Sequence, residues 1–344
     1  MSVRISHNAS LQPFNTFAVP ASAATLVELF DERSLDQALL ACGPRGPELV
    51  LGGGSNLLFT RSLEGSVLRV ATSGYQVKEQ SDTGVLVEAA AGASWHQFVM
   101  WTLSQGWAGL ENLALIPGSV GASPIQNIGA YGVELKEQFA GLSAINLRSG
   151  QPRDFLPEDC GLGYRTSVFK EPLYQDWLIL RVRFRLSRTA SLRLAYGEIR
   201  SELAKQSIDE PKAQDVADAV IRIRTRKLPS PSKLGNAGSF FKNPVIPATK
   251  ALKMHEVHAD MPQFPAPADA SGSAMVKLSA AWLIESCGWK GARQGDAGVY
   301  AEHSLVLVNH GAASGTDLMK LARDIQHSVL ERFEIAIEPE PRII

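Results

Sequence analysis

The stretch LIPGSVGASPIQNIGAYG, residues 115–132, combines glycines with apolar side chains, which is unusual for a surface loop. Glycine lets the backbone approach a ligand closely, because it has no β-carbon. Aliphatic side chains beside exposed backbone suit a flat aromatic ring that carries a diphosphate. The polar residues Ser119, Ser123, Gln126 and Asn127 stand between the glycines. The stretch therefore indicates one wall of a dinucleotide site, although composition alone also permits an ordinary cluster of turns.

A second glycine stretch, LGGGSN at 51–56, directly follows an apolar strand-like run. Consecutive backbone N–H groups in such a turn can form a concavity for anionic oxygens. The stretch is not a Rossmann fingerprint, because Leu57 stands where the third glycine belongs, and no GK[ST] follows to make a P-loop. By itself it fits a tight turn as well as a phosphate cradle. Together the two stretches could hold a dinucleotide between them.

Composition limits the classes of function. The chain has 344 residues, 45% hydrophobic and 20% charged, with a formal net charge of −1, which describes an ordinary protein of two or three domains. Near-neutral charge argues against a nucleic-acid partner. No apolar run is long enough to span a bilayer, and the N-terminus has no secretory signal. We expect a cytoplasmic protein without membrane insertion and with no evident obligate protein partner.

The cysteines point the same way. Cys42, Cys160 and Cys287 are scattered and form no CxxC pair, which argues against a disulfide framework or a zinc site. A reducing compartment is the simplest fit, and we expect no metal.

Hydrophobic periodicity predicts the elements of the first part of the chain. We expect a helix over 23–41, strands within 66–91, and a helix over 94–106 that Ser94 caps. Further strands are expected at 142–148 and 177–186. In the last of these, Val182, Phe184 and Leu186 alternate with Arg181, Arg183 and Arg185, which predicts a solvated arginine face.

The second part mixes helices and strands. Helices are expected over 214–226, 279–287 and 316–332, and strands at LVLVN and at FEIAIE, residues 333–338. The helix over 316–332 carries the core stripe Leu318, Leu321, Ile325 and Val329. The Pro- and Ser-containing LPSPSK indicates a domain boundary, and the Pro/Ala-rich residues 245–275 a loop or short insertion. The fold class is α+β.

Several longer motifs occur in a fixed order: LGGGSNLLF, GLENLALIPGSVGASPIQNIGAYG, GYRTSVFK, LAYGEI, RTRKLPSP, GNAGSFFKNP and EPEPR. In these motifs the chain resembles the UDP-N-acetylenolpyruvoylglucosamine reductase (MurB) family, in its tyrosine-loop subtype. The resemblance covers nearly the whole chain. It implies a bipartite FAD-binding unit of the vanillyl-alcohol-oxidase (PCMH) type, at about 17–188, and a C-terminal α+β substrate-binding domain. The domains implied are 1–61 with the tail 341–344, then 62–228, then 229–340.

The resemblance also implies an activity. Members of the family use NADPH and non-covalent FAD to reduce enolpyruvyl-UDP-GlcNAc to UDP-N-acetylmuramate, in peptidoglycan precursor synthesis. Hydride addition at C3 leaves negative charge on C2 and its carboxylate, so the reaction needs a cation and a proton donor. Arg165 matches the carboxylate-binding arginine, Ser239 the proton donor and Glu340 the catalytic glutamate. Ser239 is no nucleophile elbow, because Ala237 and Phe241 stand where that motif needs glycines.

The remaining site residues fall into two groups. For the nucleotide-sugar substrate the resemblance implies contacts from Tyr196, Lys227 and Asn243. The expected cofactor-binding residues are Gly52, Gly53, Gly54, Ser55, Asn56, Leu57, Pro117, Gly118, Ser119, Gly121, Ala122, Ser123, Gln126, Asn127, Gly129, Ala130, Tyr131, Gly132 and Arg342.

Two other interpretations remain at this stage. A flavin oxidase on the same scaffold would act on a small hydroxylated molecule and would not need the serine acid. A non-catalytic nucleotide-binding module would need none of Arg165, Ser239 and Glu340. The presence of all three residues favours the reductase.

Overall fold

The computed structural model describes residues 2–189 and 191–344. Unit 1, one of two compact units, takes the N-terminal residues up to Leu11, Ser22–Gly54 and Ser62–Arg226. Unit 2 takes Gln12–Ala21, Ser55–Arg61 and Lys227–Ile344. Both units mix helices and strands, so the predicted α+β class is confirmed. In the described part of the chain, no helix combines the length and the apolar character that a bilayer crossing needs.

Unit 1 begins with a mixed sheet in the order β1 (Val3–Ser10), β2 (Ser22–Leu29), β5 (Leu63–Val70) and β3 (Leu49–Leu51). β1 runs antiparallel to β2, whereas β2 and β3 run parallel to β5. Because β3 ends at Leu51, this sheet delivers the chain directly into Gly52–Gly54.

The predicted helix over 23–41 is wrong in its first half. Residues 22–29 form β2, and the α-helix α1 covers only Leu35–Ala41, after a 3-10 turn at Glu32–Ser34. β2 lies between two other strands, and its last four residues are all buried. A strand that is buried on both faces loses the alternation of polar and apolar residues, so its sequence reads like a buried helix.

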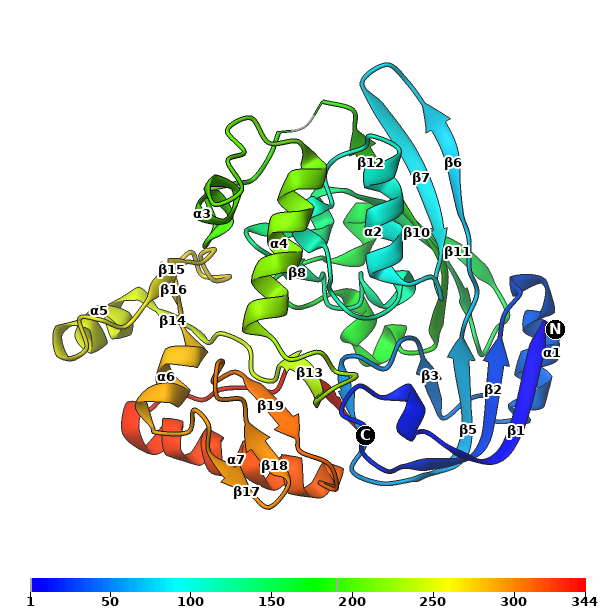
Figure 1. The fold of residues 1–344 in the computed structure, drawn as a ribbon. Helices are drawn as coiled ribbons and strands as arrows, with labels where there is room; N and C mark the ends of the chain where they lie inside the picture. The colour runs from blue at the N-terminus through cyan, green and yellow to red at the C-terminus, as the bar shows by residue number, and fades with distance from the viewer. Residues whose placement is uncertain (1, 190) are drawn as a thin grey trace. The chain divides into compact units, whose positions relative to one another are not determined.

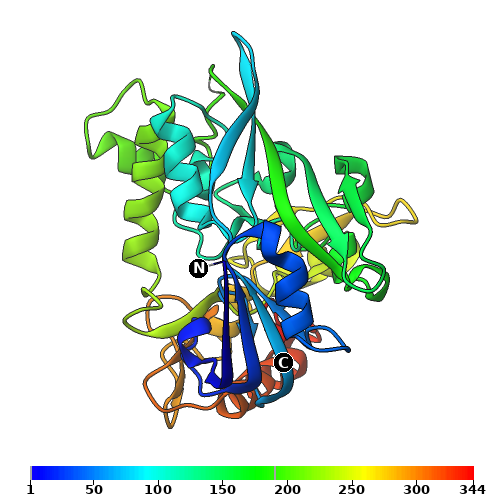
Figure 2. The ribbon, with the colours of Figure 1, turned by 90° about the vertical axis from the view of Figure 1, so that its right-hand side faces the viewer.

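The second sheet of unit 1 is antiparallel throughout, in the order β11 (Pro152–Phe155), β10 (Phe139–Asn146), β12 (Trp177–Ser187), β7 (Gly84–Ala90) and β6 (Tyr75–Gln80). Helices α2 (Trp95–Ser104) and α4 (Ala213–Lys227) lie on one side of this sheet (Figures 1 and 2). The predicted strands within 66–91, at 142–148 and at 177–186 are confirmed. The predicted helices over 94–106 and 214–226 are also confirmed, as α2 and α4. Ser94 caps α2 as expected, by accepting from the Gln97 N–H. Shorter elements are the hairpin β8 (Gly129–Ala130) and β9 (Val133–Glu134), and α3 (Ile199–Ala204).

One hydrophobic cluster joins both sheets of unit 1 to α2 and α4. At its centre the Trp95 ring lies 5.8 Å from the Phe184 ring, and the Phe98 ring 5.0 Å from it, measured between centroids. All three side chains are fully buried. Burial of each contributes about 1.5–3 kcal/mol or more to folding. The start of α2 is therefore fixed against the sheet.

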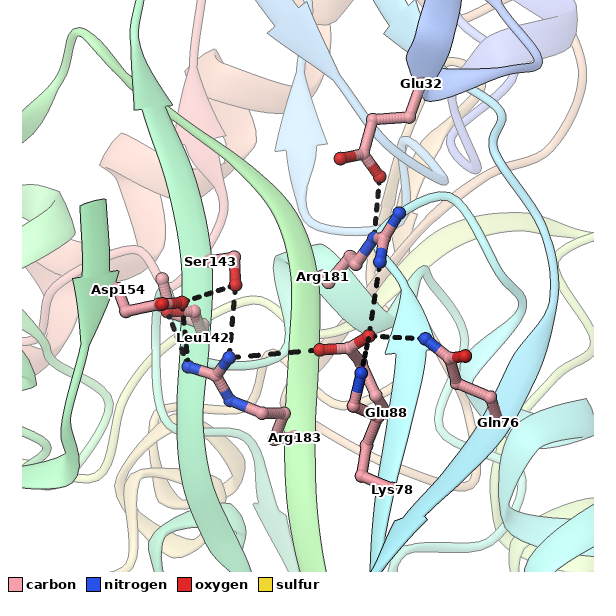
Figure 3. Close-up of polar contacts among 9 residues, drawn as sticks. All are labelled: Glu32, Gln76, Lys78, Glu88, Leu142, Ser143, Asp154, Arg181 and Arg183. Atoms are coloured by element: carbon pink, nitrogen blue, oxygen red, sulfur yellow. Dashed lines mark hydrogen bonds and ion pairs between the residues drawn. The ribbon is translucent and has the colours of Figure 1, made fainter. Parts of the chain in front are cut away.

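The predicted solvated arginine face of β12 is wrong for Arg183, whose side chain is 19% exposed, whereas the side chain of Arg181 is 42% exposed (Figure 3). Glu88 on β7 is 4% exposed and accepts from Arg181 at 3.3 Å and from Gln76 at 2.7 Å. Arg183 pairs with Glu88 at 3.8 Å and with Asp154 at 3.0 Å. A carboxylate that leaves water needs such partners. A pattern along one strand cannot reveal them, because they come from neighbouring strands.

Unit 2 is built around a sheet in the order β13 (Gly235–Ser239), β19 (Val306–Asn309), β18 (Ala297–Val299) and β17 (Arg293–Gln294). Helix α7 (Gly315–Phe333) contacts β18, β19 and α6 (Ala280–Ser286). The predicted helices over 279–287 and 316–332 are thus confirmed. The predicted core stripe of α7 is also confirmed. Its members are all fully buried: Leu318, Leu321, Ile325 and Val329.

Two further expectations for unit 2 are wrong. Residues 245–275 are more than a loop, since β14 (Val245–Pro247), α5 (Ala248–Val257) and β15 (Gln263–Pro265) form a small sheet module with β16 (Met275–Leu278). Residues 333–338 form no strand, although Ile335 and Ile337 are buried in alternation. Alternation records which side faces the core, whereas a strand also requires a partner along its length.

Unit 2 also contains segments from the N-terminal part of the chain. Phe17 is fully buried beside Phe240, and Asn309 Nδ2 donates to the Phe17 carbonyl at 3.0 Å. β4 (Leu57–Leu58) runs parallel to β20 (Arg342–Ile343) at the end of the chain. These segments complete the core of unit 2.

Candidate active site and cofactor site

The two glycine stretches touch each other. A β-carbon on Gly53 would lie 2.9 Å from the Gly118 Cα, and one on Gly52 would overlap the Ser119 hydroxyl. Gly54 has φ +63°, a conformation that side chains disfavour. The glycines are therefore required by close backbone approach. We call Gly52–Gly54 together with Pro117–Gly121 the glycine cradle.

Backbone hydrogen bonds hold the second part of the cradle against the start of α2 and the end of β7. The Trp95 N–H donates to the Gly118 carbonyl at 3.0 Å, and the Gly121 N–H donates to the Ala91 carbonyl at 2.8 Å. A β-carbon on Gly121 would lie 2.5 Å from the Ala91 Cβ. Ala122 and Ser123 follow directly, and the Ser123 hydroxyl donates to the Val120 carbonyl at 2.6 Å. The cradle is thus a rigid part of unit 1.

The stretch after the cradle is held by Asn127. This residue is fully buried at φ +45°, and its Nδ2 donates to the Gly163 carbonyl at 2.9 Å. Its Oδ1 accepts from the Lys136 N–H at 2.9 Å. Both the nitrogen and the oxygen of the Asn127 side-chain amide are therefore bonded to the backbone of this chain. Gln126 beside it is half-buried.

Arg165 lies against the same stretch. Its Nη2 donates to the Gly129 carbonyl at 2.9 Å, and its guanidinium carbon lies 5.5 Å from the centre of the Tyr164 ring. The backbone of Arg165 has φ +54°, which is uncommon for a residue with a β-carbon. The half-buried guanidinium is therefore aimed by its backbone and by Gly129 together.

Tyr196 completes this group within unit 1. Its ring centroid lies 6.2 Å from that of Tyr131, and a β-carbon on Gly132 would lie 3.2 Å from the Tyr196 Cβ. Its side chain is 51% exposed. Arg165, Gly129–Gly132 and Tyr196, which are far apart in sequence, are thus brought together.

Arg224 on α4 is a candidate site residue that none of the motifs indicated. Burial lowers the pKa of this guanidinium, and the neighbouring Tyr131 opposes the shift. Its Nε has no hydrogen-bond partner among the described residues. A buried donor without a partner is costly, so this atom suits an electron-rich atom of a bound group. The available signal was its place four residues after Val220, on the buried stripe of α4.

Ser239 lies in unit 2, at the end of β13, where it pairs with Val306. Phe240 and Phe241 after it are 0% and 1% exposed, whereas Ser239 is half-buried. Gly238 before it has φ +72° and donates its N–H to Asn236 Oδ1 at 2.9 Å. The glycine turns the strand, and the two rings anchor it.

The segment with Glu340 runs beside Ser239. The Glu340 N–H donates to the Phe240 carbonyl at 2.7 Å, and the Lys242 N–H donates to the Glu338 carbonyl at 2.9 Å. Lys242 Nζ also pairs with Glu338 at 3.1 Å. The backbone of Glu340 is thus tied to the residue that follows Ser239.

The tail after Glu340 is a paired strand. The Arg342 N–H donates to the Asn56 carbonyl at 3.0 Å, and Asn56 Nδ2 donates to the Glu340 carbonyl at 3.4 Å. Thr60 donates its N–H and its hydroxyl to the Ile344 carbonyl, at 2.8 and 2.7 Å. Four expected cofactor-binding residues therefore gather in unit 2: Ser55, Asn56, Leu57 and Arg342.

The two other expected substrate contacts are in unit 2. Asn243 Oδ1 accepts from the Ala280 N–H at 3.0 Å, so its amide nitrogen is the end that can donate to a ligand. Lys227 is exposed. Burial, and then the charge of Lys227, holds the pKa of His303 below its usual range.

Comparison with known proteins agrees with this geometry. The FAD binding domain model matches residues 24–155, and the C-terminal domain model of UDP-N-acetylenolpyruvoylglucosamine reductase matches residues 230–344. The chain is 49% identical to a UDP-N-acetylenolpyruvoylglucosamine reductase of Pseudomonas fluorescens, with both chains covered completely. It is 51% identical to that of Azoarcus sp., over 98% of this chain and 97% of the relative.

Among solved structures, MurB of Thermus caldophilus matches with a TM-score of 0.67 and 25% identity, covering 99% of this chain and 98% of that one. A solvent-stable cholesterol oxidase matches with a TM-score of 0.50 at 10% identity, over 98% of this chain and 87% of that one, and indicates the fold alone. The glycine cradle and these matches define an FAD-dependent oxidoreductase with the bipartite PCMH-type fold. The chain belongs to the UDP-N-acetylenolpyruvoylglucosamine reductase family.

Proposed function

We propose that Arg165, Ser239 and Glu340 carry the chemistry when this chain reduces enolpyruvyl-UDP-GlcNAc to UDP-N-acetylmuramate. The reaction is that of the family to which the chain belongs. The observation that carries the proposal is the hydrogen bond from Arg165 Nη2 to the Gly129 carbonyl, at 2.9 Å. It ties the carboxylate-binding cation to the stretch that follows the glycine cradle.

The residues present fit FAD. The cradle offers closely packed backbone where side chains are excluded, and Arg224 offers a buried donor without a partner among the described residues. Bound FAD would supply hydride chemistry there, with NADPH as the source of the hydride and C3 of the enolpyruvyl group as its acceptor. The backbone of Gly52–Gly54 and Gly118–Gly121 would hold the diphosphate. Ser55, Asn56 and Arg342, which belong to unit 2, are further proposed cofactor contacts. No histidine lies in either glycine stretch, so we propose non-covalent binding.

Arg165 stabilises the charge that develops on the substrate. Hydride addition at C3 moves negative charge onto C2 and the attached carboxylate. A guanidinium can bind that carboxylate through two parallel hydrogen bonds, which strengthen as the charge grows. Because Gly129 and its own backbone aim the side chain, little reorganisation is needed in the transition state.

Ser239 gives the proton to C2. A serine is a weak acid in water, so this step needs a site from which water is excluded. Phe240 and Phe241 are fully buried and anchor the end of β13, which limits the freedom of the hydroxyl. Glu340 is the third member, in the role of the family's catalytic glutamate. Its backbone bond to Phe240 restrains it.

The uridine diphosphate part of the substrate would bind to Tyr196, Lys227 and Asn243. Lys227 is exposed, as a point charge for a diphosphate can be. Asn243 would donate through its amide nitrogen, because Ala280 already bonds its oxygen. We also propose the division into 1–61 with 341–344, 62–228 and 229–340, and a place of action in the cytoplasm without an obligate protein partner.

The two half-reactions test the role of Ser239. In Ser239→Ala, NADPH should bleach the flavin band at nearly the wild-type rate, because that step involves no substrate carbon. Reoxidation by enolpyruvyl-UDP-GlcNAc should slow by about 10²- to 10⁴-fold, the usual contribution of a positioned general acid. Anaerobic stopped-flow absorbance follows both steps in one sample.

Ser239→Cys is the matched control, since a thiol can donate a proton from nearly the same place, and it should keep more activity than alanine. Loss of the NADPH step in Ser239→Ala would assign this serine to the cofactor or to the fold. Unchanged rates of both steps would remove it from the mechanism.

A further inference from the structure

His96 bonds the backbone of Leu115, which lies shortly before the glycine cradle and has an unusual conformation. It is the second residue of α2, and its Nδ1 accepts the Leu115 N–H at 3.1 Å. Leu115 has φ +57°, a left-handed conformation that residues with a β-carbon seldom adopt. Three residues later comes Gly118, whose Cα approaches Gly53. The imidazole thus bonds the backbone N–H of the same residue that adopts this conformation.

The neighbouring contacts belong to the same arrangement. Trp95, one residue before, donates its indole Nε1–H to the Leu113 carbonyl at 2.9 Å and its backbone N–H to the Gly118 carbonyl at 3.0 Å. The first turn of α2 therefore bonds the loop at Leu113, Leu115 and Gly118. Two of these contacts use Trp95, which packing fixes, and the third depends on His96 alone.

The bond requires a neutral imidazole. A backbone N–H can only donate, so Nδ1 must be unprotonated. Burial, and then the charge of Arg224 on α4, lowers the pKa of His96. The amino end of α2 also disfavours a positive charge there. The element Glu111–Leu113 also packs against α2, and its Glu111 carboxylate accepts from the Gly109 N–H at 2.6 Å. Arg224 is the charged group that acts on the pKa of this imidazole.

We propose that His96 is a positioning residue for FAD, which keeps Leu115 in its left-handed conformation and so sets Gly118 against Gly53. The proposal rests on FAD as the cofactor. His96 would thus affect FAD binding by fixing the backbone of Leu115, without contacting FAD itself.

The experiment measures FAD affinity of the apoprotein, by the change of flavin fluorescence on titration. His96→Leu removes the acceptor and should raise the FAD Kd by about tenfold or more, because Leu115 then loses the bond that holds its left-handed conformation. His96→Asn can present its Oδ1 where Nδ1 lies, and should stay within about threefold of the wild type.

Rescue at Leu115 separates positioning from direct binding. Glycine adopts the left-handed conformation without strain, so His96→Leu with Leu115→Gly should recover most of the lost affinity. The matched control is His96→Leu with Leu115→Ala, which removes the same side chain but keeps the strain and should not recover. Equal affinity of the two double variants, or wild-type affinity of His96→Leu, would overturn the proposal.

The pH dependence of the FAD Kd gives a second test. It compares the wild type with His96→Asn, and both proteins keep an acceptor for the Leu115 N–H. Because the folded-state pKa lies below the ordinary value of about 6.5, the bond is intact above that pH and is lost as the pH falls through the lowered pKa. The FAD Kd of the wild type should therefore rise below about pH 6.5. That of His96→Asn should rise less, because an amide does not titrate. Parallel pH profiles would contradict the proposal.

Discussion

Arg165 and Lys227 carry the same charge in different settings. Arg165 is half-buried, has a left-handed backbone and is bonded to Gly129, whereas Lys227 is an exposed residue at the end of α4. A cation aimed in advance can respond to charge that appears only during reaction. An exposed ammonium binds a diphosphate equally well before and during the reaction, and such uniform binding changes KM and leaves kcat unchanged.

Lys227→Ala should therefore raise the KM for the nucleotide-sugar substrate by about tenfold with little change in kcat. Arg165→Lys keeps the charge but loses the planar fork, and should lower kcat by about 10²-fold. Steady-state kinetics with NADPH saturating measures both. An equal split between kcat and KM in both variants would contradict the assignment.

At the scale of elements, the cradle depends on the meeting of two turns. β3 delivers Gly52–Gly54, and the first turn of α2 holds Gly118 and Ser119 opposite. Each contact leaves no space for a β-carbon. The ion pair from Arg181 on β12 to Glu32, 2.8 Å long, adds a link between the strand that carries Arg181 and the turn before α1 (Figure 3). Because a β-carbon at Gly52 or Gly53 would collide with the facing turn, adding a single methyl group at either glycine should disturb the FAD site.

Gly53→Ala should raise the FAD Kd by about tenfold or more, because the methyl group must displace the Gly118 backbone. The control is Gly46→Ala, where φ is +71° and no atom lies within 4 Å of the added carbon. This variant should lose some stability to backbone strain and keep its FAD affinity. Release of flavin on ultrafiltration, and thermal unfolding of the apoproteins, separate the two effects. A Gly53→Ala protein that keeps its full flavin complement would exclude this account of the cradle.

At the scale of the whole molecule, unit 2 is assembled from three separate parts of the chain. Gln12–Ala21 and Ser55–Arg61 belong to it, although the residues around them build unit 1. Their side chains Phe17, Leu58 and Phe59 are at most 1% exposed. Burial of each contributes about 1.5–3 kcal/mol, which is a large share of the stability of a small unit.

The fragment 227–344, expressed alone, should therefore fail to form a cooperative fold. It lacks three core side chains and the strand β4 that pairs with Arg342–Ile343. Near-UV circular dichroism and the binding of a hydrophobic dye compare it with the full chain. A sharp thermal transition with native-like near-UV signal would show that unit 2 does not need the two N-terminal segments.

Features that depend on neighbours along the chain could be predicted from the residue pattern alone. The glycine turns, the cap of α2 and the apolar stripes of α4 and α7 follow from residues within a few positions of one another. The ordered motifs likewise indicate the family and the cofactor, and the sequence of predicted strands and helices indicates the α+β class. Site residues such as Arg165 and Ser239 were named from these motifs, and their roles stay predictions.

Only the tertiary structure decided what depends on partners from distant segments. β2 is a strand because β1 and β5 lie on either side of it. Residues 333–338 are no strand because no described segment pairs with them along their length. The contacts of Arg224 and of His96 could not be predicted either, because their partners come from distant segments of the chain. Their unusual environments come from α2, α4 and residues 115–131, which lie together only after folding. Burial and hydrogen-bond satisfaction are properties of the surroundings, and a pattern along one segment does not contain them.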